Sequence, residues 1–229
     1  MGAYRSKLSQ VDGGLNVLEV WGRKTSSNVQ ALMWCIGELG LQYVRHEAGG
    51  IHGGTDDDDF LAMNPNGTIP VLKDARFGPL WETGAICRYL ATRYGSDSFW
   101  PNDVLGRADV DRWAEWAKLN VAMAFTVPVF WRVVRTPSAQ RDQKIIRAAV
   151  DALEHKLAIA DTVLATRSFI AGDNLTLADI QFGHVLYRYY DIEINRVELT
   201  NLRTYYSRLA GRPAFREHVM LSYDELKAE

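Results

Sequence analysis

Residues 17–40, VLEVWGRKTSSNVQALMWCIGELG, indicate a buried strand, a polar turn and a helix in immediate succession. Residues 17–22 are rich in strand formers and end at a glycine. Residues 28–39 place Val29, Leu32, Met33, Ile36 and Leu39 at helical spacing, and Gly40 is the residue type that commonly ends a helix. Four small polar residues stand at the helix entrance. They raise the question of which one caps the helix and which could hold a ligand.

The segments that follow extend this unit into a small mixed sheet with helices, an α/β fold of fewer than 100 residues. Glycine, proline and acidic residues mark the turns between the apolar runs. The predicted elements are a strand over 41–47, a turn-rich acidic loop over 48–59, a short helix over 58–64, a turn and strand over 64–74, a strand over 77–80 and a helix over 82–95.

The character of the chain changes after Gly95, because no convincing strand pattern follows. The spacing of apolar residues from Val110 onward predicts a long helix, with Pro128 as a kink or stop. Ser138 is a candidate cap for the next helix. Thr176 and Asp179 have the capping-box spacing. The predicted organisation is an N-terminal arm over 1–16, an α/β domain over 17–95, a linker over 96–106 and an all-helical domain over 107–229. Within the last domain, Gly211 is predicted to end one helix and Pro213 to begin the final one.

Composition excludes several classes of function. The net charge is −2, from 26 basic and 28 acidic residues, which gives no electrostatic case for nucleic acid or an anionic membrane. No run of about 18 apolar residues is seen, so no membrane span is expected, and the N-terminus lacks the apolar stretch of a secretory signal. The two cysteines, Cys35 and Cys87, form neither a C-x-x-C motif nor a metal cluster. We therefore expect a cytoplasmic protein without metal, in which both cysteines are small core residues.

Four local sequences together give a family resemblance that covers roughly residues 17 to 220. With TSSNVQ at the first turn, NPNGTIPVL in the proline turn, WETGAICRYL opening a helix and AGDNLTLADI in the second half, the chain resembles the cytosolic glutathione transferases. It is most similar to bacterial members that use Ser or Thr at the first turn. The resemblance implies a thioredoxin-like N-terminal domain followed by an all-helical domain, glutathione as co-substrate, and a homodimer.

The resemblance also implies a set of site residues. Ile69 and a cis Pro70 would pair by their backbone with the cysteinyl part of glutathione. Glu82 would bind the α-ammonium group of glutathione. Thr83 lies at a helix N-terminus, where it would bind a carboxylate of glutathione. The family's usual His or Lys before the proline is missing, which leaves His52 in the acidic loop as a candidate for the glycine carboxylate. The second, apolar substrate would bind the helical domain, where the candidate residues are Trp113, Trp116 and Phe130, each of which could instead be core.

The chemistry needs a donor for a thiolate, because a thiol with a pKa of about 8.5–9 is only a few per cent ionised at neutral pH. Lowering that pKa by about two units requires about 2.7 kcal/mol of differential stabilisation. Ser27 and Gln30 have capping-box spacing, which predicts that Ser27 is the N-cap and leaves Ser26 free to hold the thiolate. In the family, the active residue lies 14 positions before the glycine that ends the first helix, and counting back from Gly40 also selects Ser26.

Alternatives remain at this turn and for the function. Ser27 and Thr25 stay as alternative thiolate partners, and Asn28 is either a second donor to sulfur or only a polar first-turn residue. The leading function is conjugation of glutathione to an apolar electrophile, a detoxification reaction. Glutathione-dependent reduction of small disulfides or peroxides at the same site is the second hypothesis. A non-catalytic binding protein of the same fold is the third.

Overall fold

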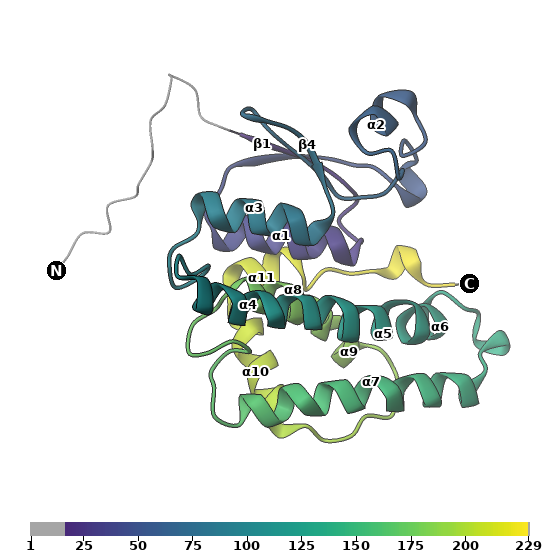
Figure 1. The fold of residues 1–229 in the computed structure, drawn as a ribbon. Coiled ribbons are helices and arrows are strands. Elements are labelled where there is room, and N and C mark those ends of the chain that lie inside the picture. The colour runs from purple at the N-terminus through teal and green to yellow at the C-terminus, as the bar shows by residue number, and fades with distance from the viewer. Residues whose placement is uncertain (1–16, 229) are drawn as a thin grey trace.

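The first half of the chain is a four-stranded mixed sheet with helices, as predicted. The computed structural model describes residues 17–228, so the predicted arm over 1–16 lies outside the described residues. The strand order is β2-β1-β3-β4, with β1 parallel to β2 and the other pairs antiparallel. Figure 1 shows α1 and α3 together beneath the sheet and α2 beyond its opposite side. The elements are β1 (Leu18–Trp21), α1 (Ser27–Glu38), β2 (Tyr43–His46), a 3₁₀ turn (Gly50–His52), α2 (Asp58–Met63), β3 (Val71–Asp74), β4 (Phe77–Trp81) and α3 (Thr83–Tyr94).

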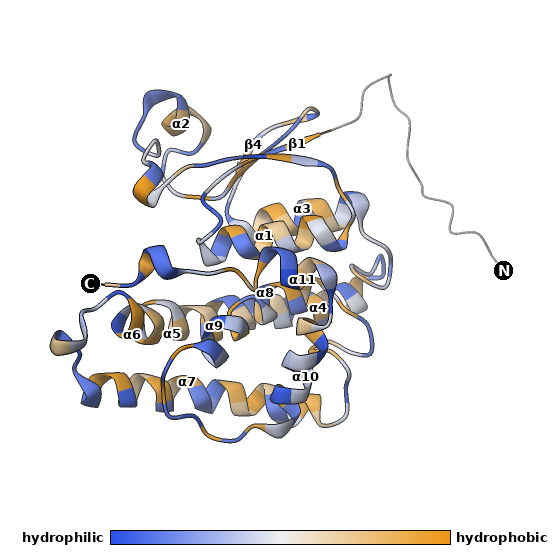
Figure 2. Ribbon diagram, turned by 180° about the vertical axis from the view of Figure 1, so that it is seen from behind, coloured by the Kyte–Doolittle hydropathy of each residue, from blue (hydrophilic) through white to orange (hydrophobic). Residues whose placement is uncertain are grey.

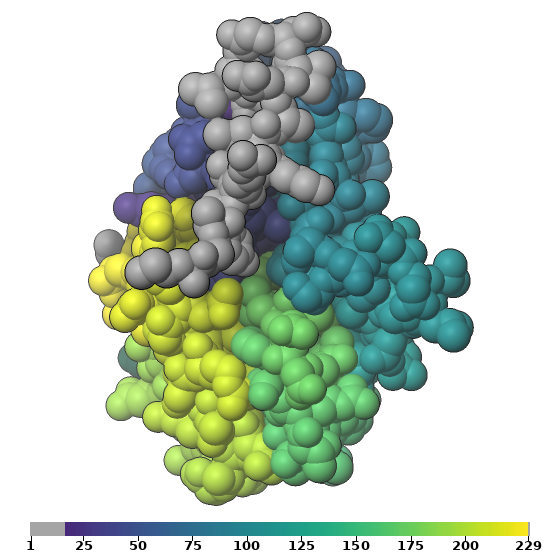
Figure 3. All heavy atoms as spheres, turned by 90° about the vertical axis from the view of Figure 1, so that its left-hand side faces the viewer, coloured from purple at the N-terminus to yellow at the C-terminus, as the bar shows by residue number. Residues whose placement is uncertain are grey.

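The second half is helical throughout the described residues. Figure 3 shows its green and yellow surface below the blue surface of the first half. Apolar and polar residues alternate along α7, as expected for an amphipathic helix with one buried face (Figure 2). The elements are α4 (Val104–Trp116), a π-helical segment (Ala117–Ala122), α5 (Met123–Phe125), a second π-helical segment (Thr126–Trp131), α6 (Arg132–Val134), a 3₁₀ turn (Ser138–Gln140), α7 (Gln143–Leu164), α8 (Leu177–Gly183), α9 (Leu186–Asp191), α10 (Thr200–Ala210), α11 (Pro213–His218) and a final 3₁₀ turn (Asp224–Leu226).

The structure contradicts a helix stop at Pro128 and a helix cap at Ser138, whereas the alternative of a kink at Pro128 stays a prediction. Pro128 does not stop its helix, because it lies inside the π-helical segment Thr126–Trp131 and the helical run continues to Val134. A π-helical turn alters the local hydrogen-bond pattern, which accommodates the missing N–H of proline. Ser138 does not cap α7. Asp142 does, by accepting hydrogen bonds from the backbone amides of residues 144 and 145.

The run Val104–Val134 also corrects the expectation that no segment is apolar enough to span a membrane. By length and composition it is the one described helix that could do so. Core helices of soluble proteins pass the same test, and α4 packs closely against α8 in this fold. The run is therefore weak evidence for a span.

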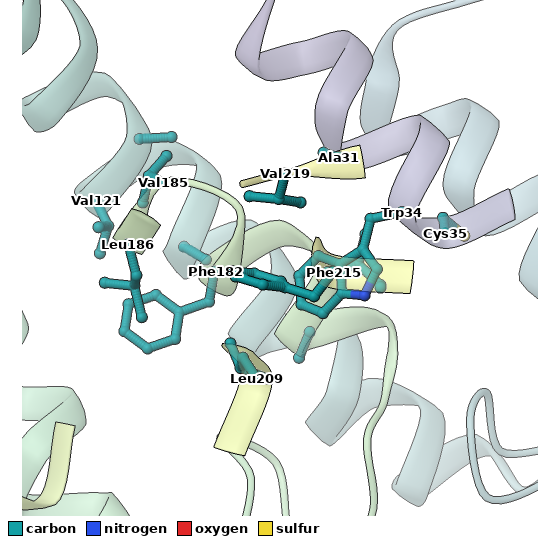
Figure 4. Packing of buried hydrophobic residues seen from close by; sticks show 14 of the residues in the cluster. Ala31, Trp34, Cys35, Val121, Phe182, Val185, Leu186, Leu209, Phe215 and Val219 are labelled. Atoms are coloured by element: carbon teal, nitrogen blue, oxygen red, sulfur yellow. The ribbon is translucent and has the colours of Figure 1, made fainter. Parts of the chain in front are cut away.

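The two halves share one hydrophobic core, centred on the buried helix α1. The Trp34 ring on α1 packs edge-on against Phe215 of α11, with centroids 4.8 Å apart (Figure 4). Glycines allow this close approach: a Cβ on Gly183 of α8 would lie 2.9 Å from the Trp34 ring, and a Cβ on Gly37 would lie 2.9 Å from Ala214. Because α1 contacts the sheet on one side and the helical half on the other, its first turn is held between the two halves.

The predicted capping box at Thr176 and Asp179 is confirmed. The Asp179 carboxylate is fully buried and accepts hydrogen bonds from the amides of Thr176 and Ile170 and from the Tyr205 hydroxyl, at 2.8, 3.0 and 2.8 Å. These bonds join α8 to the preceding loop and to α10. Burial raises the pKa of this carboxyl, and the bonded amides oppose that shift.

Candidate functional site

Four connecting segments of the first half meet at one end of the sheet, where β1, β2 and β4 end and β3 begins. Trp21 at the end of β1 lies opposite Val71 at the start of β3 and opposite His46 at the end of β2. Val71 in turn lies opposite Trp81 at the end of β4. The turn before α1, the loop after β2, the proline turn before β3 and the start of α3 are therefore brought to one end of the sheet. This arrangement gathers the sequence-predicted site residues of the first half.

Ser26, and not Ser27, is the N-cap of α1, which corrects the prediction for this turn. The Ser26 carbonyl accepts the first helical hydrogen bond from Gln30 N at 2.8 Å, and its hydroxyl oxygen lies 3.5 Å from Val29 N. Gln30 is then the fourth helical residue and is buried, and its side chain finds no hydrogen-bond partner among residues 17–228. It cannot reach back to complete a capping box, which needs the third helical position.

Capping leaves the hydroxyl proton of Ser26 available. The cap uses only the oxygen, as an acceptor, and at 3.5 Å the bond is at the long limit for N–H···O. The amides of Ser27 and Asn28 form no hydrogen bond within residues 17–228, as expected for the first turn of a helix. Ser26 thus combines a half-buried O–H donor with the positive end of a 12-residue helix.

Asn28 is oriented by a residue that the sequence did not single out. Its amide oxygen accepts a hydrogen bond from Lys118 Nζ at 3.2 Å, across 90 residues of sequence. Because the oxygen faces Lys118, the amide NH₂ group is directed elsewhere. The only sequence signal for Lys118 is a cation within the apolar helical run, which by itself predicts no partner.

Thr25, an alternative thiolate partner in the sequence analysis, joins the two halves of the protein. It is 1% exposed, and its carbonyl oxygen accepts from Arg188 Nη2 at 2.7 Å. Its hydroxyl donates to the carboxylate of Glu225 in the C-terminal segment. The side chain of Thr25 therefore faces the second half.

The proline turn presents an unpaired piece of backbone. The Ile69–Pro70 peptide bond is cis, and among residues 17–228 neither the amide nor the carbonyl of Ile69 has a hydrogen-bond partner. Asn64 fixes the turn from within, by donating to the Thr68 carbonyl at 2.7 Å. Gly22 brings the turn close to α1, since a Cβ there would lie 2.5 Å from Val29 and 3.4 Å from Ile69. An unpaired strand-like edge beside the first turn of α1 suits an extended peptide.

Glu82 and Thr83 lie at the entrance of α3. Glu82 is exposed and has a φ of 69°, and it is the one residue other than glycine in the described chain with a positive φ. Such a conformation costs on the order of 1–3 kcal/mol and is concentrated at functional sites. Thr83 is buried at the first helical position, where the backbone amides favour an anion.

The other residues predicted for the site, His52 and three aromatic residues of the second half, differ in burial and in their contacts. His52 lies in the loop after β2, with its Nε2 3.5 Å from the Glu47 carboxylate. Trp113 and Trp116 are half-buried on α4 with ring centroids 5.2 Å apart, and Trp116 also packs on the core residue Phe182. Phe130 is 1% exposed, because Tyr223 of the C-terminal segment covers its ring at 5.2 Å.

No metal site is found in the described part of the chain, and its two cysteines lie buried against each other. Residues 17–228 contain no group of three His, Cys, Asp or Glu side chains that could hold a metal ion. Cys35 and Cys87 are free and fully buried. The hydrogen bond with Cys87, together with burial, raises the pKa of Cys35 well above its usual value, so this thiol is unsuited to act as a nucleophile.

Comparisons with known proteins agree in both halves of the chain. Residues 25–93 match the family described as glutathione S-transferase, N-terminal domain, and residues 120–213 match glutathione S-transferase, C-terminal domain. The chain is 35% identical over 206 residues to glutathione S-transferase GstB of Escherichia coli strain K12, covering 90% of this chain and 99% of GstB.

Structural comparison gives the same family. The fold is similar to that of the theta class glutathione S-transferase from the citrus canker pathogen Xanthomonas axonopodis pv. citri with glutathione bound, with a TM-score of 0.85 and 40% identity over 90% of this chain and 99% of that one. The disulfide-bond oxidoreductase YghU of Escherichia coli strain K12 is a further relative, 30% identical over 175 residues that cover 72% of this chain and 58% of YghU. From both its sequence matches and its architecture, this chain belongs to the glutathione S-transferase family.

Proposed function

We propose that this protein is a glutathione transferase that binds the tripeptide at the end of its sheet, beside the turns that flank the inner strands β1 and β3, and holds the thiolate at Ser26 for attack on an electrophile. The observation that carries the proposal is the meeting of four features at one end of the sheet. They are the Ser26 hydroxyl at the start of α1, the unpaired backbone of Ile69, the strained Glu82 and the buried Thr83.

The γ-glutamyl end of glutathione would bind at the entrance of α3. Its carboxylate suits the Thr83 hydroxyl and the backbone amides of the first turn. Its ammonium group suits the exposed carboxylate of Glu82, which lies one residue before that turn. The unfavourable φ of Glu82 is consistent with a carboxylate held in position for a ligand.

The cysteinyl unit would add to the turn before β3. The Ile69 amide and carbonyl would each form a hydrogen bond with the peptide, in the manner of an added strand. These two bonds would direct the cysteine side chain toward the first turn of α1, because Gly22 holds Ile69 and Val29 close together. For the glycine carboxylate, His52 remains our candidate, with its imidazole near Glu47.

The thiolate would be stabilised by three kinds of donor at the start of α1. The Ser26 hydroxyl donates directly, the unpaired amides of the first turn supply partial positive charge, and the NH₂ group of Asn28 is a further donor because Lys118 holds the amide oxygen. The thiol proton leaves to solvent. The sulfur then forms a bond to the electrophilic carbon, and the leaving group departs with its electron pair.

Reduction of small disulfides by two glutathiones is a second candidate function, favoured by the orientation of Asn28. An amide donor beside Ser26 would stabilise a thiolate that leaves a disulfide as well as one that attacks carbon. The similarity to the disulfide-bond oxidoreductase YghU adds to this reading. No cysteine of the chain would take part, because both are buried.

Two steady-state assays separate these functions. We expect conjugation of a chloronitrobenzene to glutathione, and a much slower reduction of 2-hydroxyethyl disulfide with excess glutathione. A disulfide rate higher by orders of magnitude would make disulfide reduction the main activity. A protein that failed to bind a glutathione-affinity column and catalysed neither reaction would instead be a non-catalytic member of the family.

The subunit arrangement is also part of the proposal. Leu119, Met123, Val127 and Trp131 form a line of exposed apolar side chains at four-residue spacing along the long helical run, which we call the apolar stripe. These side chains are between 43% and 62% exposed. A second copy of the chain that covered the apolar stripe would give the homodimer implied by the family resemblance. We place the enzyme in the cytoplasm, where two free cysteines stay reduced.

A further inference from the structure

Lys118 brings a positive charge from the helical half to the start of α1. Its Nζ donates a hydrogen bond to the amide oxygen of Asn28 at 3.2 Å, and Asn28 lies two residues after Ser26. Lys118 and Asn28 are both half-buried, so solvent and small molecules can reach this contact. Lys118 therefore lies beside the proposed thiolate site without closing it.

The ammonium group of Lys118 forms no ion pair with a carboxylate of residues 17–228. Its one hydrogen bond within these residues is to a neutral amide. Glu115, three residues earlier on the same helical run, is paired with Arg88 instead. A lysine ammonium has three N–H donors, so two remain for other acceptors. A partly desolvated cation without a counter-ion beside a reaction site favours negative charge that develops there during the reaction.

The helix around Lys118 departs from regular α-helical geometry. Lys118 is the second residue of the π-helical segment Ala117–Ala122, which packs against α8. Segments of this kind are rare, alter the side-chain spacing of an α-helix, and are frequent at functional sites. The next residue, Leu119, belongs to the apolar stripe, whereas Lys118 reaches the first turn of α1. The same run thus presents an apolar side to a partner and a cation to the proposed thiolate site.

The separation between Lys118 and the thiolate suits an electrophile with a conjugated oxygen. Nζ and the glutathione sulfur would lie roughly 6–9 Å apart, because the Asn28 amide separates two hydrogen bonds of about 3 Å each. An α,β-unsaturated ketone spans a similar length. The sulfur attacks its β-carbon from about 3–3.5 Å, and its oxygen, three bonds away, accepts a hydrogen bond of about 3 Å. Trp113 and Trp116, the aromatic candidates for the second substrate on α4, lie in the adjoining turns of the same run.

We propose that Lys118 is a catalytic and specificity-determining residue, whose ammonium group donates to an oxygen of the second substrate that becomes negatively charged as the sulfur attacks. This proposal rests on the proposed transferase function. With an α,β-unsaturated ketone, the sulfur forms a bond to the β-carbon, and the electron pair of the carbon–carbon double bond moves to the carbonyl oxygen. Lys118 stabilises the resulting enolate by a charge-assisted hydrogen bond. A proton from solvent then adds to the α-carbon, replacing the proton that left the thiol, and no group leaves.

Two electrophiles with the same phenyl ring test the proposal. In 4-phenyl-3-buten-2-one the attacked carbon is conjugated to a carbonyl oxygen, whereas benzyl chloride has no such oxygen and releases chloride. For each, kcat/KM is divided by the uncatalysed rate constant with glutathione, which corrects for intrinsic reactivity. The ratio for the ketone divided by the ratio for benzyl chloride is the carbonyl preference. We expect a carbonyl preference of about tenfold or more, as for one hydrogen bond to a charged group.

Three variants and one control locate the effect. Lys118→Met removes the charge and the donors and should abolish the carbonyl preference, a loss of about tenfold or more. Lys118→Arg keeps a charged donor and should retain most of the preference. Asn28→Ala acts on the sulfur, so it should slow both reactions by the same factor. The control Lys144→Met removes the same charge from an exposed position of α7 and should change neither rate. Urea unfolding checks that each variant is folded.

The possible outcomes are distinct. If Lys118→Met slows both reactions by the same factor, this proposal is overturned, because Lys118 then acts only by orienting Asn28. Turnover of benzyl chloride without a carbonyl preference, or turnover of a chloronitrobenzene but not of the ketone, would also overturn it. Each of these results leaves the transferase function standing. If none of the three electrophiles reacts, the transferase function fails, and this proposal fails with it.

Discussion

Replacing Ser26 by alanine removes the hydroxyl donor while keeping the start of α1. Ser26 has two roles in this account, N-cap and thiolate donor, and they use different parts of the hydroxyl. The capping contact to Val29 N is 3.5 Å long. Its loss should therefore lower the free energy of unfolding by about 0.5 kcal/mol, the low end for an N-cap. A hydrogen bond to a charged group contributes about 1.5–3 kcal/mol, so its loss should raise the pKa of bound glutathione by about 1–2 units.

Ultraviolet titration of the thiolate in the enzyme–glutathione complex measures this pKa directly. We expect Ser26→Ala to bind glutathione within a few-fold of the wild type, because Ile69, Glu82 and Thr83 are untouched. Its conjugation rate near pH 6.5 should fall about tenfold to 100-fold and recover at high pH, following the fraction of thiolate. A change in folding alone would not shift the pH profile in this way.

Ser27→Ala is the matched control, because Ser27 carries the same hydroxyl one residue later, inside the helix. It should leave the pKa of bound glutathione unchanged. An unchanged pKa in Ser26→Ala, or an equal rise in Ser27→Ala, would refute the assignment of Ser26 as the thiolate donor.

Three further predictions concern the scaffold. Asp179→Ala leaves four buried donors without their acceptor and should lower the free energy of unfolding in urea by about 3–5 kcal/mol; a loss below about 1 kcal/mol would contradict the role of this carboxylate. Burial lowers the pKa of His184 to about 3, so between this pH and about 6.5 the unfolded chain carries a proton on His184 that the folded protein lacks. The free energy of unfolding should therefore fall as the pH drops below about 6.5, by up to about 1.4 kcal/mol per pH unit. His184→Gln should flatten that slope in urea unfolding at pH 6 and 5, and an unaltered slope would assign the effect to other groups. Met123→Arg places a charge on the apolar stripe and should give a monomer by light scattering. The matched control is Ile159→Arg at an exposed apolar residue of α7 outside the stripe, which should stay dimeric; an intact Met123→Arg dimer would place the interface elsewhere.

Local patterns predicted most elements of the fold, because each depends on neighbours in sequence. The strands, the helices α1 and α3, and the Thr176–Asp179 capping box were all predicted correctly. The same capping-box reasoning failed at Ser27, and the difference is physical. The position at which the chain enters α1 is influenced by Arg188 and Glu225, which hold Thr25 from 163 and 200 residues away. A four-residue sequence pattern contains no information about contacts with residues so far away in the chain.

Long-range contacts also explain what was missed in the candidate site. Lys118 contacts Asn28 only because the helical half folds against α1. Phe130 was predicted to line a pocket, and it is covered by Tyr223 from the C-terminal segment. Ile69, Glu82 and Thr83 could be proposed from sequence because each lies in a short motif. The residues that connect the two halves, among them Arg188, carry no local signal.

The most direct test of the central claim is a crystal structure of the protein with glutathione bound. We expect the glutathione sulfur to lie roughly 3–3.5 Å from the Ser26 hydroxyl oxygen, within hydrogen-bond range, with the Asn28 NH₂ group facing the same sulfur. A sulfur bound instead to Ser27 or Thr25, or more than about 5 Å from Ser26, would contradict it.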